Sequence, residues 1–95
     1  MSNNLIAKSF IGEWKDLNGT VITITPNRSK KGYYEINYAN GRGPFVGSSF
    51  SEIIPPILTV DFTDDGGNKS GQVSSDWSKI KWDNETEWIN LHLKD

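Results

Sequence analysis

The sequence predicts an all-β fold: an antiparallel up-and-down meander of about eight short strands that closes into a small barrel. Apolar and polar residues alternate with a period of two through most of the chain, which is typical of half-buried strands. Short groups of Gly, Asn, Asp and Pro separate these stretches and leave room only for tight turns between antiparallel neighbours. The alternative is a two-sheet β-sandwich that divides at Pro55-Pro56.

The chain has 95 residues, which is the size of a single domain. Residues 1–9 form an N-terminal segment, the one stretch whose pattern allows a helical turn. Residues 10–95 form the single β-barrel domain.

The first four strands are predicted from alternation and from the residues that end them. Asn18-Gly19 favours positive φ and therefore a tight hairpin. Pro26 stops the β-branched stretch before it, and Tyr34, Ile36 and Tyr38 share one face of the next strand. The expected strands of this half are 10–15, 20–25, 33–38 and 43–50.

The second half begins at a connection through Pro55-Pro56, where neither proline can donate to a sheet. Leu58, Val60 and Phe62 then share one face, and turns follow at 64–68, 76–78 and 84–85. The expected strands of this half are 57–62, 70–75, 79–83 and 86–93.

Three of the four tryptophans, Trp14, Trp82 and Trp88, fall on the inward phase of their strands. Gly12 and Trp14 share one face of the strand, and we expect the Trp14 ring to fill one end of the core. An eight-stranded barrel is either filled by side chains or holds one small ligand. A ligand inside the barrel is excluded if the inward-facing side chains fill the barrel interior. These residues are Tyr34, Ile36, Leu58, Val60, Phe62 and Trp82.

Composition excludes several classes of protein. The chain has no cysteine, which excludes disulfides, thiol catalysis and Cys-ligated metal centres. The N-terminus shows no signal-peptide pattern. Together these observations lead us to expect a cytoplasmic protein. No apolar stretch is long enough for a membrane helix. The net charge is −2 without a concentrated basic face, so neither a nucleic acid nor a membrane is expected as partner.

Gly12-Glu13-Trp14, at the opening of the first strand, resembles the Gly-x-Trp signature of lipocalin-type barrels. The stretch from Gly12 to Thr25 is similar to the first hairpin of avidins, and Ser70-Gly71-Gln72 is similar to a later avidin strand. The resemblance implies a calycin-like barrel with binding groups at Asp16, Thr20 and Tyr34. Where avidins use an uncharged amide this chain has Asp16, whose carboxylate would repel the ureido carbonyl of biotin.

No catalytic group of residues is evident, so we do not expect an enzyme. His92 is the single histidine and has no neighbouring nucleophile in the pattern. Asp61, Asp64 and Asp65 lack the alternating spacing of a calcium loop, so no metal or other cofactor is expected.

In a meander, alternate turns share an end of the barrel. The turns at 16–19, 40–42, 64–68 and 84 lie at one end, and those at 27–31, 55–56 and 77 lie at the other. We place the ligand site at the second end, because Trp77 occupies a turn tip and the same end carries the only basic cluster, Arg28, Lys30 and Lys31. The alternative is that Trp77 has a structural role and caps the core.

The predicted function is a non-catalytic binding module that recognises a small sugar-like or anionic ligand at this barrel end. The alternative is a protein-interaction domain, such as a protease inhibitor or an assembly subunit. It would present residues 40–44 or an edge strand to its partner. The sequence leaves the identity of the ligand and the oligomeric state open.

Overall fold

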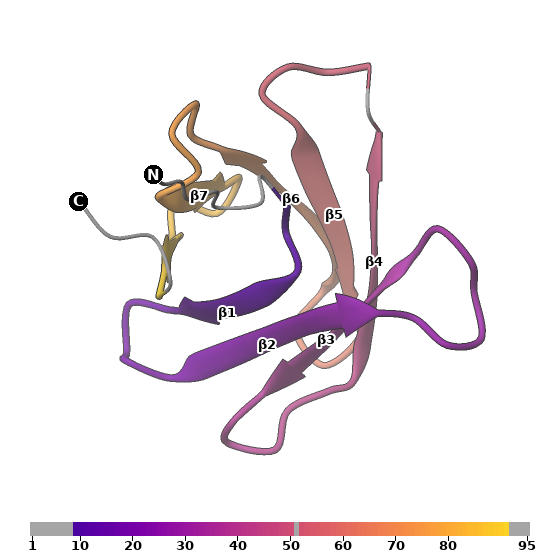
Figure 1. Ribbon diagram of the computed structural model, residues 1–95. Helices are drawn as coiled ribbons and strands as arrows, with labels where there is room; N and C mark the ends of the chain where they lie inside the picture. Colours follow the sequence, from indigo (N-terminus) through magenta and orange to yellow (C-terminus); the bar gives the residue numbers. More distant parts are fainter. Residues whose placement is uncertain (1–8, 51, 92–95) are drawn as a thin grey trace, which may run out of the picture.

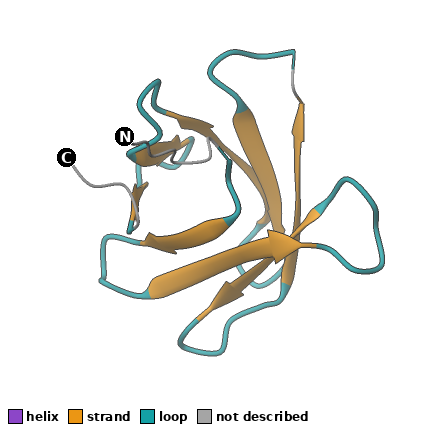
Figure 2. Cartoon of the chain, viewed as in Figure 1, coloured by secondary structure: helices purple, strands orange, loops and turns teal. Residues whose placement is uncertain are grey.

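A computed structural model describes residues 9–50 and 52–91, which form a closed barrel of eight antiparallel strands in chain order (Figure 1). The predicted up-and-down barrel is confirmed. The sandwich alternative is wrong, because β8 pairs with β1 and closes the sheet. Strands and loops account for all of the described chain (Figure 2), and the helical turn predicted within residues 1–9 falls almost wholly outside it. None of the described residues belongs to a helix long and apolar enough to span a membrane.

The strands follow the alternation seen in the sequence, with most bounds shifted by one or two residues. They are β1 (Gly12–Lys15), β2 (Val21–Pro26), β3 (Tyr34–Tyr38), β4 (Phe45–Phe50), β5 (Ile57–Phe62), β6 (Gly67–Val73), β7 (Lys79–Trp82) and β8 (Glu87–Asn90).

The bounds of β6 differ most from expectation. The polar residues after Phe62 predict a longer turn. In the structure the Asp65 N–H donates to the Phe62 carbonyl at 2.9 Å, and the chain reverses in this tight turn. Gly67 then pairs with Phe62, and Lys69 pairs with Val60. Directly opposed residues on antiparallel strands share a face, so Lys69 faces the barrel interior as Val60 does.

The middle of the barrel is filled by aliphatic side chains. Seven of them are at most 1 % exposed: Ile22, Ile24, Ile36, Leu58, Val60, Val73 and Ile80. Trp14 is buried beside them, and its indole nitrogen donates to the Phe10 carbonyl at 3.0 Å. The predicted inward faces are confirmed, and the filling excludes a ligand in the middle of the barrel.

Ring contacts gather at the two ends of the barrel. Phe10, Tyr34 and Trp77 form one group, at the end made by the β2–β3, β4–β5 and β6–β7 connections, which we call the capped end. The other group lies at the end made by the β1–β2, β3–β4, β5–β6 and β7–β8 turns, which we call the cavity end: Tyr38, Phe45, Phe62, Trp82 and Trp88.

Candidate functional site

A cavity of about 220 Å³ lies at the cavity end. Its floor consists of aromatic residues from β3, β5, β7 and β8, and its wall consists of Lys69 from β6 and mostly polar residues from the turns around the mouth. The lining residues are Asp16, Leu17, Asn18, Tyr38, Arg42, Phe62, Asp65, Lys69, Trp82, Asn84, Thr86 and Trp88.

The floor is a network of close ring contacts. The centroids of Trp82 and Trp88 are 4.7 Å apart, and Phe62 lies 5.8 Å from Trp82. Tyr38 contacts Trp88 edge-on at 6.0 Å. A β-branched or small residue at these positions would leave the end of the barrel open, so the rings complete the core and form the apolar floor of the cavity.

Gly71 on β6 creates the space for Trp82. A Cβ at position 71 would lie 2.7 Å from Trp82 Cδ2 and 2.9 Å from its Cε3. The six-membered ring of Trp82 therefore lies directly on the backbone of β6.

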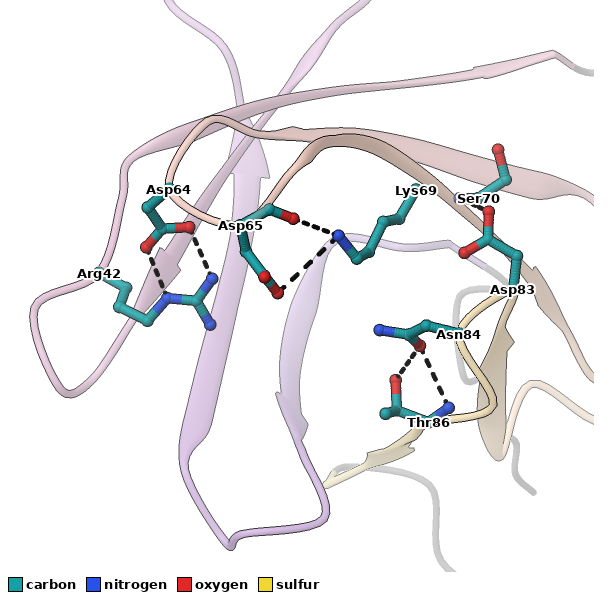
Figure 3. A network of polar contacts seen from close by, with 8 residues as sticks. All are labelled: Arg42, Asp64, Asp65, Lys69, Ser70, Asp83, Asn84 and Thr86. Atoms are coloured by element: carbon teal, nitrogen blue, oxygen red, sulfur yellow. Dashed lines mark hydrogen bonds and ion pairs between the residues drawn. The ribbon is translucent and has the colours of Figure 1, made fainter.

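Arg42 forms one side of the wall. Its guanidinium carbon lies 4.4 Å from the centre of the Tyr38 ring, a cation–π distance. Its Nε and Nη2 each donate to one carboxylate oxygen of Asp64 at 2.8 Å (Figure 3). This hydrogen bonding raises the pKa of Arg42 and lowers the pKa of Asp64, so both groups stay charged and the charge of Arg42 is balanced.

Lys69 and Asp65 form the next side. The Lys69 ammonium donates to the Asp65 carbonyl oxygen and lies 3.8 Å from a carboxylate oxygen of the same residue (Figure 3). It also lies 5.7 Å from the centre of the Phe62 ring. The lining therefore contains two cations, Arg42 and Lys69, and two carboxylates, Asp16 and Asp65, and carries no net formal charge.

The remaining wall comes from two turns that are held by their own side chains. Asp16 Oδ1 accepts the N–H groups of Asn18 at 3.0 Å and Thr20 at 2.9 Å. Asn84 Oδ1 accepts from the N–H and hydroxyl of Thr86. Its amide nitrogen has no partner within the described chain, and Figure 3 shows it on the side facing Asp65 and Lys69.

Two hydrogen-bonding groups belong to the floor. Burial raises the pKa of Tyr38 to about 12, so its phenol is neutral and keeps its proton at physiological pH. Trp82 is 5 % exposed, and its Nε1 is buried without a hydrogen-bond partner among residues 9–50 and 52–91. A buried donor left unpaired costs about 1–3 kcal/mol.

The groups that line this cavity are suited to holding a molecule. The wall offers donors and acceptors, and the floor offers ring faces. None of the residues that line it is a cysteine, histidine or serine. Within the described residues there is also no group of three or more His, Cys, Asp or Glu side chains placed to hold a metal ion.

The structure places the sequence-predicted site residues differently. Trp77 was assigned to the predicted ligand site, with capping of the core as the alternative; the ring is 9 % exposed and lies 5.1 Å from Phe10, so the structure supports the cap. The residue takes a left-handed φ of 62°, and its carbonyl accepts from the Asn90 amide at 3.0 Å. The β6–β7 turn therefore folds back, and Trp77 caps the core, which is the structural role given above as the alternative.

The basic cluster does not join Trp77. Arg28, Lys30 and Lys31 are exposed on the β2–β3 loop, which projects on the opposite side of Figure 1 from the β6–β7 turn. Asn27 Oδ1 accepts two N–H groups of this loop, and Lys30 lies over the Tyr33 ring at 4.8 Å. The four residues are thus not brought together, and the geometry gives no support to a ligand site among them.

Several wall residues were not singled out by sequence reasoning, although their turns were assigned to the correct end. The missed residues include Lys69 and Arg42. For Lys69 a signal was present, because period-two alternation runs backwards from Val73 through Gly71 to Lys69. For Arg42 there was none, since its partner Asp64 lies 22 positions away.

Comparison with protein-family models, curated proteins and solved structures gives no match to this chain. The similarity of Gly12-Glu13-Trp14 to lipocalin-type and avidin-type barrels therefore stays a prediction. Of the binding residues that it implied, Asp16 lines the cavity, while Tyr34 packs against Phe10 at the capped end.

Proposed function

We propose that the protein is a non-catalytic binding module that holds a small, uncharged, sugar-like molecule in the cavity end of the barrel. The observation that carries this proposal is an aromatic floor surrounded by a polar wall of zero net charge. Ring faces pack against the C–H faces of a sugar ring, while carboxylates, amides and cations bond its hydroxyls.

The size of the cavity favours a single ring. Drug-sized ligands occupy pockets of roughly 300–1,000 Å³. A volume of about 220 Å³ is below that range and fits a monosaccharide.

Charge favours a neutral ligand over an anion. Each cation of the wall already faces an acid: Arg42 binds Asp64 through two hydrogen bonds, and Lys69 lies beside Asp65. An anion would have to compete with these carboxylates and would also face Asp16. Of the sugar-like and anionic ligands predicted from the sequence, the site favours the first.

The experiment is a titration with D-glucose, D-galactose, D-mannose, L-fucose and N-acetyl-D-glucosamine, with sodium phosphate and sodium acetate as anionic probes. Binding is followed by tryptophan fluorescence, because Trp82 and Trp88 line the cavity, and by calorimetry. We expect at least one sugar to saturate the site, and neither anion to do so. A failure of every sugar to saturate would reject the proposal.

A matched pair of variants locates the site. Leu17 is 67 % exposed at the cavity mouth, and Ile54 is 86 % exposed at the capped end. Withdrawing each CH₂ from water is worth about 0.8 kcal/mol, so Leu17→Ala should weaken sugar binding several-fold where the ligand covers it. Ile54→Ala should leave it unchanged. Equal effects of the two substitutions would place the ligand elsewhere.

One observation favours the second candidate, a protein-interaction domain. Ile53 and Ile54 are adjacent and exposed at the β4–β5 connection, a position where apolar side chains contribute little to the core. The closed sheet leaves no edge strand in the described residues for strand addition. Light scattering at rising concentration, in the parent and Ile54→Asp, tests this turn as an assembly surface: self-association that the substitution abolishes supports it.

A further inference from the structure

Two asparagines of this chain are followed by glycine, Asn18-Gly19 and Asn40-Gly41, and both pairs lie in turns at the cavity end. Such pairs are prone to deamidation, because a glycine has no Cβ to shield its backbone nitrogen from the side chain before it. We propose that Asn18 is a site of spontaneous deamidation and that the fold protects Asn40. Since Asn18 lines the cavity, the modification would alter the candidate site itself.

The reaction uses only the chain and water. The backbone nitrogen of Gly19 attacks Cγ of Asn18 and loses its proton, while the nitrogen of the asparagine amide leaves as ammonia. The new N–C bond closes a succinimide ring. Water then opens the ring at one of its carbonyl carbons and leaves either aspartate or isoaspartate. In sum, an amide and a water molecule become a carboxylic acid and ammonia.

The two turns have the same backbone arrangement. The Gly19 N–H donates to the Asp16 carbonyl at 3.0 Å. The Gly41 N–H donates to the Tyr38 carbonyl, also at 3.0 Å. Both glycines have a left-handed φ, 85° and 96°, and a Cβ at either position would meet no atom within 4 Å. Both asparagines are exposed, so access to water does not separate them.

The side chains of the two asparagines are held differently. Asn40 Oδ1 accepts the backbone N–H of Arg42 at 3.1 Å, which fixes its side-chain carbonyl. The Asn18 side chain has no hydrogen-bond partner among the residues described, and its backbone N–H donates to Asp16 Oδ1. Cγ of Asn18 can therefore turn toward Gly19 without breaking a hydrogen bond of the protein, whereas Asn40 must first give up its bond to Arg42.

Deamidation would change the charge of the cavity wall. The lining holds the cations Arg42 and Lys69 and the carboxylates Asp16 and Asp65. An acid in place of Asn18 adds a third carboxylate, so the modified cavity carries one net negative charge. This inference concerns the charge of the protein itself and holds whichever molecule the cavity binds.

The test follows both asparagines while the folded full chain is incubated in mildly alkaline buffer, which favours loss of the proton from the attacking nitrogen. Subsequent cleavage with trypsin places Asn18 in peptide 16–28 and Asn40 in peptide 32–42, and mass spectrometry measures conversion of amide to acid. We expect Asn18 to react about fivefold faster or more. A factor of five corresponds to about 1 kcal/mol, the net contribution of one neutral hydrogen bond.

A parallel incubation in concentrated urea separates the effect of the fold from that of the local sequence. Unfolding removes the bond between Asn40 and Arg42, so the two Asn-Gly pairs should then react at nearly equal rates. Asn27 and Asn37 lie in the same two peptides and are followed by arginine and tyrosine. They serve as internal controls and should stay unmodified in both incubations.

A pair of variants gives an independent measurement. Asn18→Asp marks the position of the acidic product in anion-exchange chromatography, and the parent should gain a form that elutes there. Asn18→Gln keeps an amide at an exposed position but removes the reactive pair, so it should gain little of this form.

Three outcomes would overturn the inference: equal rates at Asn18 and Asn40 in the folded chain, a faster reaction at Asn40, or the same preference for Asn18 in urea. None of them bears on sugar binding, so the proposed function is tested separately.

Discussion

The Trp77 ring lies 5.1 Å from the Phe10 ring, and this contact closes the capped end of the barrel while the opposite end keeps a cavity. The two ends thus use aromatic residues differently. At the capped end they complete the core, and at the cavity end they form a floor beneath charged and polar turns.

The first prediction separates these roles. Trp77→Ala should lower the free energy of unfolding by about 3–5 kcal/mol, the range for deleting a buried large aromatic ring, and leave sugar affinity unchanged in the folded fraction. Trp88→Ala should lower stability and abolish binding. Urea unfolding and calorimetry measure the two quantities. Loss of binding in folded Trp77→Ala would return the capped end to consideration.

Trp14 should be essential for stability. The residue is 1 % exposed, and its indole bonds the Phe10 carbonyl at 3.0 Å, tying the start of the barrel to its core. Trp14→Ala should cost about 3–5 kcal/mol, and Trp14→Phe should cost less because it keeps a ring. Urea unfolding of both variants gives the comparison. A loss below about 1 kcal/mol in the alanine variant would show that the ring does not support the core.

Gly71→Ala should damage both stability and binding. The added methyl would lie 2.5 Å from Ile80 Cγ2 and 2.7 Å from Trp82 Cδ2, so both side chains must move. Overpacking of this kind typically costs about 1–3 kcal/mol. Gly47→Ala is the control, because its methyl would meet Ile36 Cδ1 at 2.8 Å, away from the cavity. We expect both variants to lose stability, and only Gly71→Ala to lose sugar affinity; equal affinities would show that Trp82 does not shape the site.

Asp64→Asn should change the ligand charge that the site accepts. The substitution removes the carboxylate that receives both hydrogen bonds of Arg42 and leaves that cation uncompensated at the cavity wall. Exposed charges contribute only modestly to binding, so the affinity for D-glucuronate relative to D-glucose should rise roughly two- to fivefold. Calorimetry with the two sugars measures the ratio. An unchanged ratio would indicate that Arg42 does not contact the ligand.

Acid stability should depend on Asp76. Hydrogen bonds from the Ser74 and Ser78 hydroxyls, both 2.7 Å from Asp76 Oδ1, hold the pKa of Asp76 at about 2, below its ordinary 3.8. The folded-state pKa is lowered, so the contribution to stability is present above pH 3.8 and is lost as the pH falls through about 2.

Urea midpoints measured across this pH window test the prediction. Asp76→Asn should be less stable than the parent at neutral pH, and its midpoint should fall less on acidification. Glu85→Gln, at an exposed turn carboxylate, is the control and should keep the acid sensitivity of the parent. Identical acid profiles for Asp76→Asn and the parent would contradict the assignment.

The sequence by itself determined the fold class, the order of the strands, the inward residues and the grouping of turns at the two ends. These features follow from local information: period-two alternation identifies the buried face, and Asn-Gly or Pro-Pro marks where the chain reverses. The same rules placed residues 16–19, 40–42, 64–68 and 84 at one end, which is the cavity end of the structure.

Only the tertiary structure decided which end carries the cavity. A tryptophan at a turn tip is compatible with exposure or with folding back, and the outcome for Trp77 depends on the position of Phe10, 67 residues earlier. The pairing of Arg42 with Asp64 and the unpaired indole of Trp82 likewise depend on which side chains meet in space. Strand phase is set by neighbours in the chain, whereas a cavity is set by how side chains from distant strands fill one end, and local patterns do not encode that packing.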